Sequence, residues 1–135
     1  MATNQSFGGN FESRESLDRI LDTELISAFL ACGDLDDRRE FAEEIFGVFI
    51  SQTRDLLGRC RSANLSRDYG ERARIIHRLK GSAGNVGALL VSEEAAAVER
   101  AATDSQEYEV SLAIARLEAA VELTINQIGA FLAGM

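Results

Sequence analysis

Proline is absent from all 135 residues of this chain. Proline breaks helices and is common in turns, so a chain without it can run through long, uninterrupted helices. Apolar residues recur at three- and four-residue steps along most of the sequence, and no segment keeps the strict alternation of a strand. Alanine, leucine, glutamate and arginine, all good helix formers, are abundant. The sequence therefore predicts an all-α protein.

The apolar periodicity predicts five helical segments with short connections between them. After a flexible arm over residues 1–15, we expect helices over residues 16–31 (with a break near Asp22), 34–62 (capped by Asp34), 67–84 (capped by Ser66), 89–102 and 106–132. Short connections make neighbours in sequence antiparallel neighbours in space. We therefore expect one domain over residues 16–135, a four-helix up-down bundle with an additional N-terminal helix laid over one end.

Apolar residues at helical spacing predict the buried faces of the second and third segments. On the second segment these are Phe41, Ile45, Val48, Phe49, Leu56 and Cys60, and on the third they are Tyr69, Ala73, Ile76 and Ala83. Ile76 and Leu79 are expected to point inward. The side chain of His77, which lies between them, is then expected to face solvent.

Charge and motif content exclude several classes of protein. The net charge of −8 argues against binding to nucleic acid or to an anionic membrane. No apolar run approaches the length that spans a membrane, and no signal peptide precedes the first segment, so we expect a cytoplasmic protein. The motifs of phosphate-binding loops, zinc proteases and serine hydrolases are missing. One histidine and two distant cysteines cannot form an ordinary zinc site, so we expect no metal.

One segment, residues 75–88, has the residue types of a reactive site. It contains the only histidine, His77, and the only lysine, Lys80. On a helix these two residues form a single stripe with Gly81 and Gly84. Each glycine costs the helix about 1 kcal/mol relative to alanine. Two explanations for the presence of these glycines remain open here: they let a partner approach the imidazole, or they let helices pack closely inside the bundle.

The histidine and the lysine together suggest phosphoryl chemistry. A neutral imidazole nitrogen is a good nucleophile toward phosphorus at cytoplasmic pH. A phosphorylated histidine carries about two negative charges. The ammonium of Lys80, one helical turn away, could neutralise part of that charge.

The run HRLKGSAGNVGA resembles the signature of histidine-containing phosphotransfer domains, H-x-[LI]-K-G-[SAG]-[SA]-x-x-[LIVF]-G, and meets every restricted position. The resemblance implies a four-helix bundle with an exposed phosphoacceptor histidine, His77. It also implies transfer to and from aspartates of receiver domains, which supply Mg²⁺, while the carrier binds no cofactor of its own. In that family a Glu or Gln that orients the imidazole commonly lies 22 positions after the histidine, and here that residue is Glu99. The alternative for Glu99 is an ordinary surface ion pair with Arg100.

The leading hypothesis is a stand-alone, monomeric phosphorelay carrier that is not itself an enzyme. Its expected partners are response-regulator receiver domains and a sensor or hybrid histidine kinase, and Arg78, Gly81, Ser82 and Gly84 are expected to contact them. One alternative is an interaction module that docks on a receiver or kinase without being phosphorylated. Another is a hydrolytic site with His77 as general base, which would need an oxyanion-binding group that only Lys80 could supply.

Overall fold

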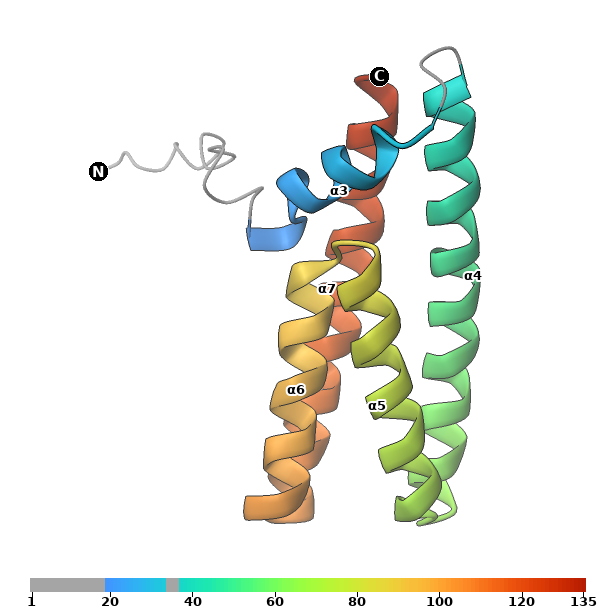
Figure 1. The fold of residues 1–135 in the computed structure, drawn as a ribbon. Coiled ribbons are helices and arrows are strands. Elements are labelled where there is room, and N and C mark those ends of the chain that lie inside the picture. Colours follow the sequence, from blue (N-terminus) through green and yellow to red (C-terminus); the bar gives the residue numbers. More distant parts are fainter. Residues whose placement is uncertain (1–18, 34–36) are drawn as a thin grey trace, which may run out of the picture.

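The structure is a computed structural model that describes residues 19–33 and 37–135, and all the secondary structure in these residues is helical (Figure 1). Its helices are α3 (Thr23–Leu30), α4 (Arg38–Leu65), α5 (Tyr69–Asn85), α6 (Leu89–Asp104) and α7 (Glu107–Ala133). The arm expected over residues 1–15 and the cap expected at Asp34 lie outside the described residues. The expected break at Asp22 is present, because this residue caps α3 by accepting a hydrogen bond from the Leu25 amide.

The four long helices α4 to α7 run alternately up and down, and each packs against the next. Helix α7 also packs against α4, which closes the bundle. The short helix α3 lies across the end of the bundle where α5 turns into α6 (Figure 1). The predicted architecture, a four-helix bundle with an additional helix over one end, is therefore confirmed.

An aromatic cluster joins α3 to the bundle. The ring of Phe46 on α4 is fully buried. Its centroid lies 6.4 Å from that of Phe29 on α3 and 6.2 Å from that of Phe131 on α7. Aromatic pairs at this spacing stabilise a core beyond the area that they bury. The cluster therefore fixes the position of α3 over the end of the bundle.

The predicted buried faces of α4 and α5 are partly wrong. Val48 is 53% exposed, Ala73 is exposed and Tyr69 is 40% exposed. The face of α4 that is buried consists of Ala42, Phe46, Phe49, Thr53, Leu56, Leu57, Cys60 and Ala63. The prediction selected apolar residues at helical spacing, but burial depends on which neighbouring helices cover a position, so Val48 is exposed whereas Ala42 and Thr53 are buried.

The predicted cap of the third helix is also wrong. Ser66 ends α4, and the carboxylate of Asp68 caps α5 by accepting a hydrogen bond from the Glu71 amide at 3.1 Å. Between them Arg67 adopts a φ of 60°, in the left-handed region. A helix commonly ends in this conformation on glycine. Because the position holds arginine here, this turn could not be predicted from the sequence.

Arg72 joins three helices at the end of the bundle opposite α3. Its guanidinium is buried, donates to Asn64 Oδ1 of α4 at 2.7 Å, and pairs with both carboxylate oxygens of Glu107 of α7 at 2.8 and 3.0 Å. It also lies over the Tyr69 ring, 4.3 Å from the centroid. The hydrogen bonds from Arg72 hold the pKa of the Glu107 carboxyl below its ordinary value. The part of stability that comes from this shift is therefore present above the ordinary pKa and is lost as the pH falls through the lowered one.

Replacing Arg72 by methionine should lower the free energy of unfolding by about 2 kcal/mol. The expected loss is smaller than for a fully enclosed ion pair, because Glu107 is half exposed and can be hydrated when its partner is removed. Urea denaturation at neutral pH measures the change. Arg74→Met is the matched control, since its ion pair with Glu71 is exposed and should contribute less than about 0.5 kcal/mol. Equal losses in the two variants would contradict the role given to Arg72.

Candidate functional site

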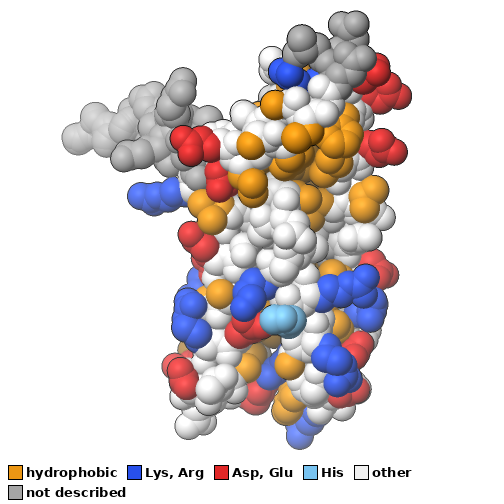
Figure 2. Space-filling model, in the orientation of Figure 1, with side chains coloured by type: hydrophobic (Ala, Val, Ile, Leu, Met, Phe, Trp, Pro, Cys, Tyr) orange, Lys and Arg blue, Asp and Glu red, His pale blue; other side chains and the backbone are white. Residues whose placement is uncertain are grey.

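Helix α5 presents His77 to solvent. Ile76 and Leu79, on either side of it in sequence, are fully buried, as expected. The imidazole is 76% exposed. Since the core side chains fix the rotation of α5, the ring lies outward without taking part in the packing of the bundle. In Figure 2 it is the pale blue group in the lower half of the visible face.

Glu99 of α6 joins the histidine and the lysine of α5. Its Oε2 lies 3.2 Å from His77 Nδ1, and its Oε1 accepts a hydrogen bond from Lys80 Nζ at 2.6 Å. An ionised carboxylate can only accept, so the contact favours the tautomer with its proton on Nδ1. The other ring nitrogen, Nε2, then carries the free lone pair. Among the described residues Glu99 makes no ion pair with Arg100, which was the alternative considered for it.

The negative charge of Glu99 is stabilised by its neighbours Lys80 and His77. The hydrogen bond from Lys80 is the main cause that holds the pKa of this carboxyl below its ordinary value; partial burial opposes the shift, and the contact with His77 adds to it. Glu99 therefore stays ionised throughout the neutral range. A fixed negative charge beside Nδ1 favours a ring that gains positive charge during a reaction.

The two glycines after His77 differ in their surroundings. A Cβ added at Gly81 would meet nothing within 4 Å, and one added at Gly84 would meet only Ser92 Oγ, at an ordinary 3.7 Å. Helix packing among the described residues therefore requires neither glycine, which argues against the packing interpretation. The Ser92 hydroxyl instead donates to the backbone oxygen of Lys80 at 3.3 Å, a contact between α5 and α6 that the sequence did not predict.

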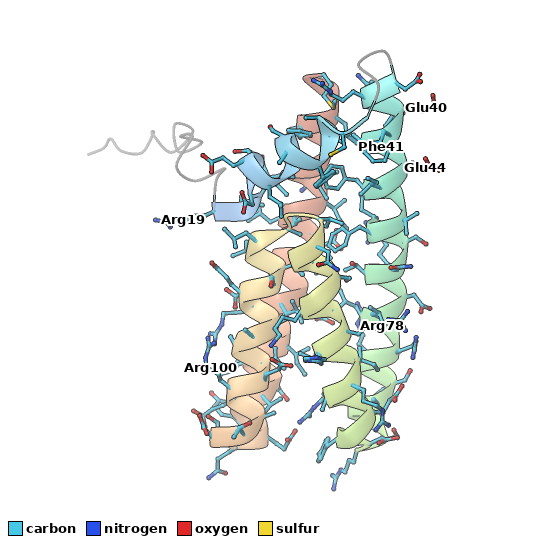
Figure 3. The ribbon with its side chains drawn as sticks, viewed as in Figure 1. Arg19, Glu40, Phe41, Glu44, Arg78 and Arg100 are labelled. Atoms are coloured by element: carbon cyan, nitrogen blue, oxygen red, sulfur yellow. The ribbon has the colours of Figure 1, made fainter. Side chains whose placement is uncertain are left out.

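Ser82 and Arg78 lie on α5 beside this stripe. Ser82 is half-buried, and its hydroxyl donates to the Leu79 carbonyl oxygen at 3.3 Å. Arg78 is exposed and extends from α5 on the side of α4 (Figure 3). Of the residues expected at the site, the structure thus brings together His77, Lys80 and Glu99, and it leaves Arg78 and Gly81 open to solvent.

An apolar hollow of about 400 Å³ lies between α4 and the end of α5. It is lined by Phe41, Glu44, Ile45, Val48, Phe49, Gln52, Ser82 and Val86. Apolar side chains gather on the same visible face as the histidine, nearer to α3 (Figure 2). Both Val48 and Ile45 are predicted to be core residues, but Val48 is exposed and Ile45 is only partly buried, and both line the hollow.

The part of the chain that the structure describes holds no group of three or more histidine, cysteine, aspartate or glutamate residues that could bind a metal ion. None of the helices described is both long and apolar enough to cross a membrane. The candidate site consists of the exposed His77 imidazole with the Glu99 carboxylate and the Lys80 ammonium beside it.

Comparison with known proteins identifies one family. Residues 44–131, which include most of α4, all of α5 and α6 and most of α7, match the family model described as Hpt domain. No curated protein and no solved structure matches the chain significantly.

Proposed function

The chain belongs to the family of histidine-containing phosphotransfer (Hpt) domains, and on that premise we propose that it carries a phosphoryl group on His77. Hpt domains are phosphocarrier modules of phosphorelays. The observation that carries the assignment to His77 is its geometry: an exposed imidazole whose Nδ1 faces Glu99 and whose Nε2 is free. It is also the only histidine of the chain.

The proposed reaction is transfer between His77 and a receiver aspartate. Nε2 attacks the phosphorus of an aspartyl phosphate, a P–N bond forms, and the P–O bond breaks as the aspartate carboxylate leaves. The proton stays on Nδ1, where Glu99 stabilises the positive charge of the ring. Lys80 lies one turn away and can turn from Glu99 toward the new phosphoryl oxygens. The reverse steps pass the group to a second receiver.

The carrier itself supplies few of the catalytic groups. We propose that Mg²⁺ is held by the receiver, and that this chain binds no cofactor and is not an enzyme on its own. Gly81 and Gly84 leave the side of α5 around the imidazole free of side chains, so that a receiver can approach. The receiver would extend from His77 over Arg78 and Ser82 to the apolar hollow of α4 and α5.

The proposed setting is a phosphorelay in the cytoplasm, with the carrier acting as a monomer between a sensor or hybrid histidine kinase and response regulators. Both cysteines are free. Free thiols are typical of a reducing compartment, which supports this location.

A transfer profile tests the proposed function. The full chain is incubated with each phosphorylated receiver domain of the same cell, and label on this protein is followed with time. At least one receiver should label it quickly. If receivers bind but none transfers label, the chain is an interaction module and the carrier function is refuted. If no receiver binds or transfers label, the carrier function is refuted as well.

Replacing Gly81 by glutamine should slow transfer from a receiver by about tenfold or more, because a side chain one turn from the imidazole keeps the reacting atoms apart. The measurement is single-turnover transfer with the fastest receiver of the profile. Gly129→Gln is the matched control, since Gly129 is also an exposed helical glycine with nothing within 4 Å of an added Cβ, but on α7. Wild-type transfer by Gly81→Gln would show that close approach does not depend on this position.

Replacing Glu99 by alanine should lower the transfer rate by about 10- to 100-fold without abolishing transfer, as for other residues that orient a reactive imidazole. The nucleophile remains, but the preference for the Nδ1–H tautomer and the partner of Lys80 are lost. Glu99→Gln should recover part of the rate, because its amide oxygen can still accept from Nδ1–H. Glu93→Ala, an exposed change on the same helix, is the control. Equal rates for Glu99→Ala and Glu93→Ala would contradict the orienting role.

A further inference from the structure

Several basic side chains lie around His77 although the chain as a whole is acidic. Helix α5 carries four basic residues and one acidic residue, a formal charge of +3, whereas the whole chain carries −8. Figure 2 shows Lys and Arg side chains around the pale blue histidine. Helix α6, which carries Glu99, has four acidic residues and one basic residue, so the positive charge near His77 comes from individual side chains and not from the net charge of the two helices.

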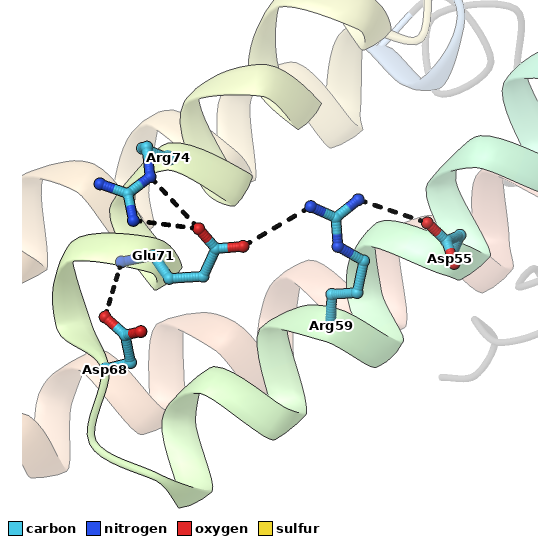
Figure 4. Close-up of polar contacts among 5 residues, drawn as sticks. All are labelled: Asp55, Arg59, Asp68, Glu71 and Arg74. Atoms are coloured by element: carbon cyan, nitrogen blue, oxygen red, sulfur yellow. Dashed lines mark hydrogen bonds and ion pairs between the residues drawn. The ribbon is translucent and has the colours of Figure 1, made fainter.

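Several arginines of α4 and α5 are already neutralised by carboxylates of the same chain. Arg59 pairs with Asp55 and with Glu71 of α5, and Arg74 pairs with Glu71 (Figure 4). On the α4–α7 side of the bundle, Arg54 pairs with Glu122 and Arg61 with Glu118. An arginine with a carboxylate partner within its own chain contributes little to the attraction of another protein.

Arg78 and Arg100 are different. Both are exposed, and neither has an ion-pair or hydrogen-bond partner within residues 19–33 and 37–135. Arg78 follows His77 on α5, and Arg100 follows Glu99 on α6. In Figure 3 their side chains extend to opposite sides of the α5–α6 pair. Two unpaired guanidinium groups therefore flank the imidazole, one from each of the helices that build the site.

We propose that Arg78 and Arg100 bind carboxylates at the rim of the acceptor site of the partner receiver and so align its aspartate with His77. This inference rests on the proposed function. A guanidinium matches a carboxylate in a bidentate geometry, and one such contact on each side of the reacting atom fixes the orientation of the partner. The charge that Lys80 can give to the phosphoryl group is separate from this contact. Receivers with carboxylates at both matching positions are thereby preferred.

The test uses Arg78→Gln, Arg100→Gln and the double variant of the full chain, with Arg116→Gln as control. Arg116 is also exposed and without a partner in the described part of the chain, but it lies on α7, behind α5 and α6 in Figure 1. All single variants change the net charge equally. The donors are the receiver domain that labels the wild type fastest and phosphoramidate, a small donor that needs no docking surface.

In the double variant the second-order rate constant for transfer from the receiver should fall about tenfold at low salt, with a weaker dependence on salt than in the wild type. In each single variant this rate constant should fall about threefold. The rate at saturating receiver should fall too, because a receiver bound without these contacts aligns its aspartate less well with His77. Labelling by phosphoramidate and transfer to Arg116→Gln should match the wild type.

Three outcomes would overturn the inference. In the first, the double variant keeps the wild-type rate constant and salt dependence. In the second, the rate constant of Arg116→Gln falls as much as that of Arg78→Gln. In the third, labelling of the double variant by phosphoramidate falls in parallel with its labelling by the receiver. The last outcome would mean that the arginines act on the phosphoryl group itself. A wild type that no receiver labels refutes the proposed function together with the inference, whereas the three outcomes above leave the carrier function intact.

Discussion

Replacing His77 by glutamine should abolish labelling by every phosphodonor and leave the fold unchanged. His77 is the only histidine, so no second imidazole can accept the group. Its ring is 76% exposed and lies outside the core, so its loss removes no packing. The label on the wild type should be stable in alkali and labile in acid, as a phosphoramidate is. Far-UV circular dichroism and urea denaturation should not distinguish the variant from the wild type.

Arg74→Gln provides the matched control for this experiment. Arg74 is an exposed residue of α5, about one turn before the histidine, and its ion pair with Glu71 should contribute little to stability. This variant should still be labelled. Labelling that persists in His77→Gln would refute the assignment of the phosphoacceptor, and loss of helicity in that variant would contradict the exposed position of the ring.

The architecture could be predicted because the apolar period of the sequence is regular. Ile76 and Leu79 are fully buried, and the side chain between them is exposed, as the helical period requires. The end of α5 could also be predicted, because glycines are frequent where helices end. The boundaries were less predictable. Arg67 adopts a left-handed turn that glycine usually provides, so the sequence placed the cap of α5 at Ser66 when it is Asp68.

The site was predictable to a smaller extent. A one-turn relation such as that of His77 and Lys80 follows from helix geometry alone. The contact between His77 and Glu99 joins two helices, so it depends on how α5 and α6 cross, and it was expected only from a family resemblance. The exposure of Val48 was missed for a related reason. Burial on a helix depends on which neighbours cover each position, and the apolar character of Val48 does not reveal that no described helix covers it.

Gly87 sets how α5 turns into α6, and it also contacts α3. Its φ is +79°, and it ends α5 with the paired hydrogen bonds of a Schellman turn, from its own amide to Gly84 and from the Ala88 amide to Ala83. Its carbonyl oxygen accepts from the Asp22 amide at 2.8 Å. An added Cβ would lie 2.9 Å from Ile26 Cγ1 and 3.3 Å from the Asp22 carbonyl oxygen. Both the backbone conformation and the space around it therefore exclude a side chain.

Replacing Gly87 by alanine should lower the free energy of unfolding by about 2–4 kcal/mol, the sum of a left-handed alanine and an overpacked contact. Gly81→Ala is the matched control, because the same change on an open helical surface should raise stability by up to about 1 kcal/mol. Urea denaturation of both variants measures the difference. Equal stability would mean that α3 moves away from the turn at little cost. A large loss of unfolding free energy would show that the turn between α5 and α6 depends on Gly87, the glycine that ends the motif. This turn sets how α5 and α6 cross, and the contact between His77 and Glu99 depends on that crossing.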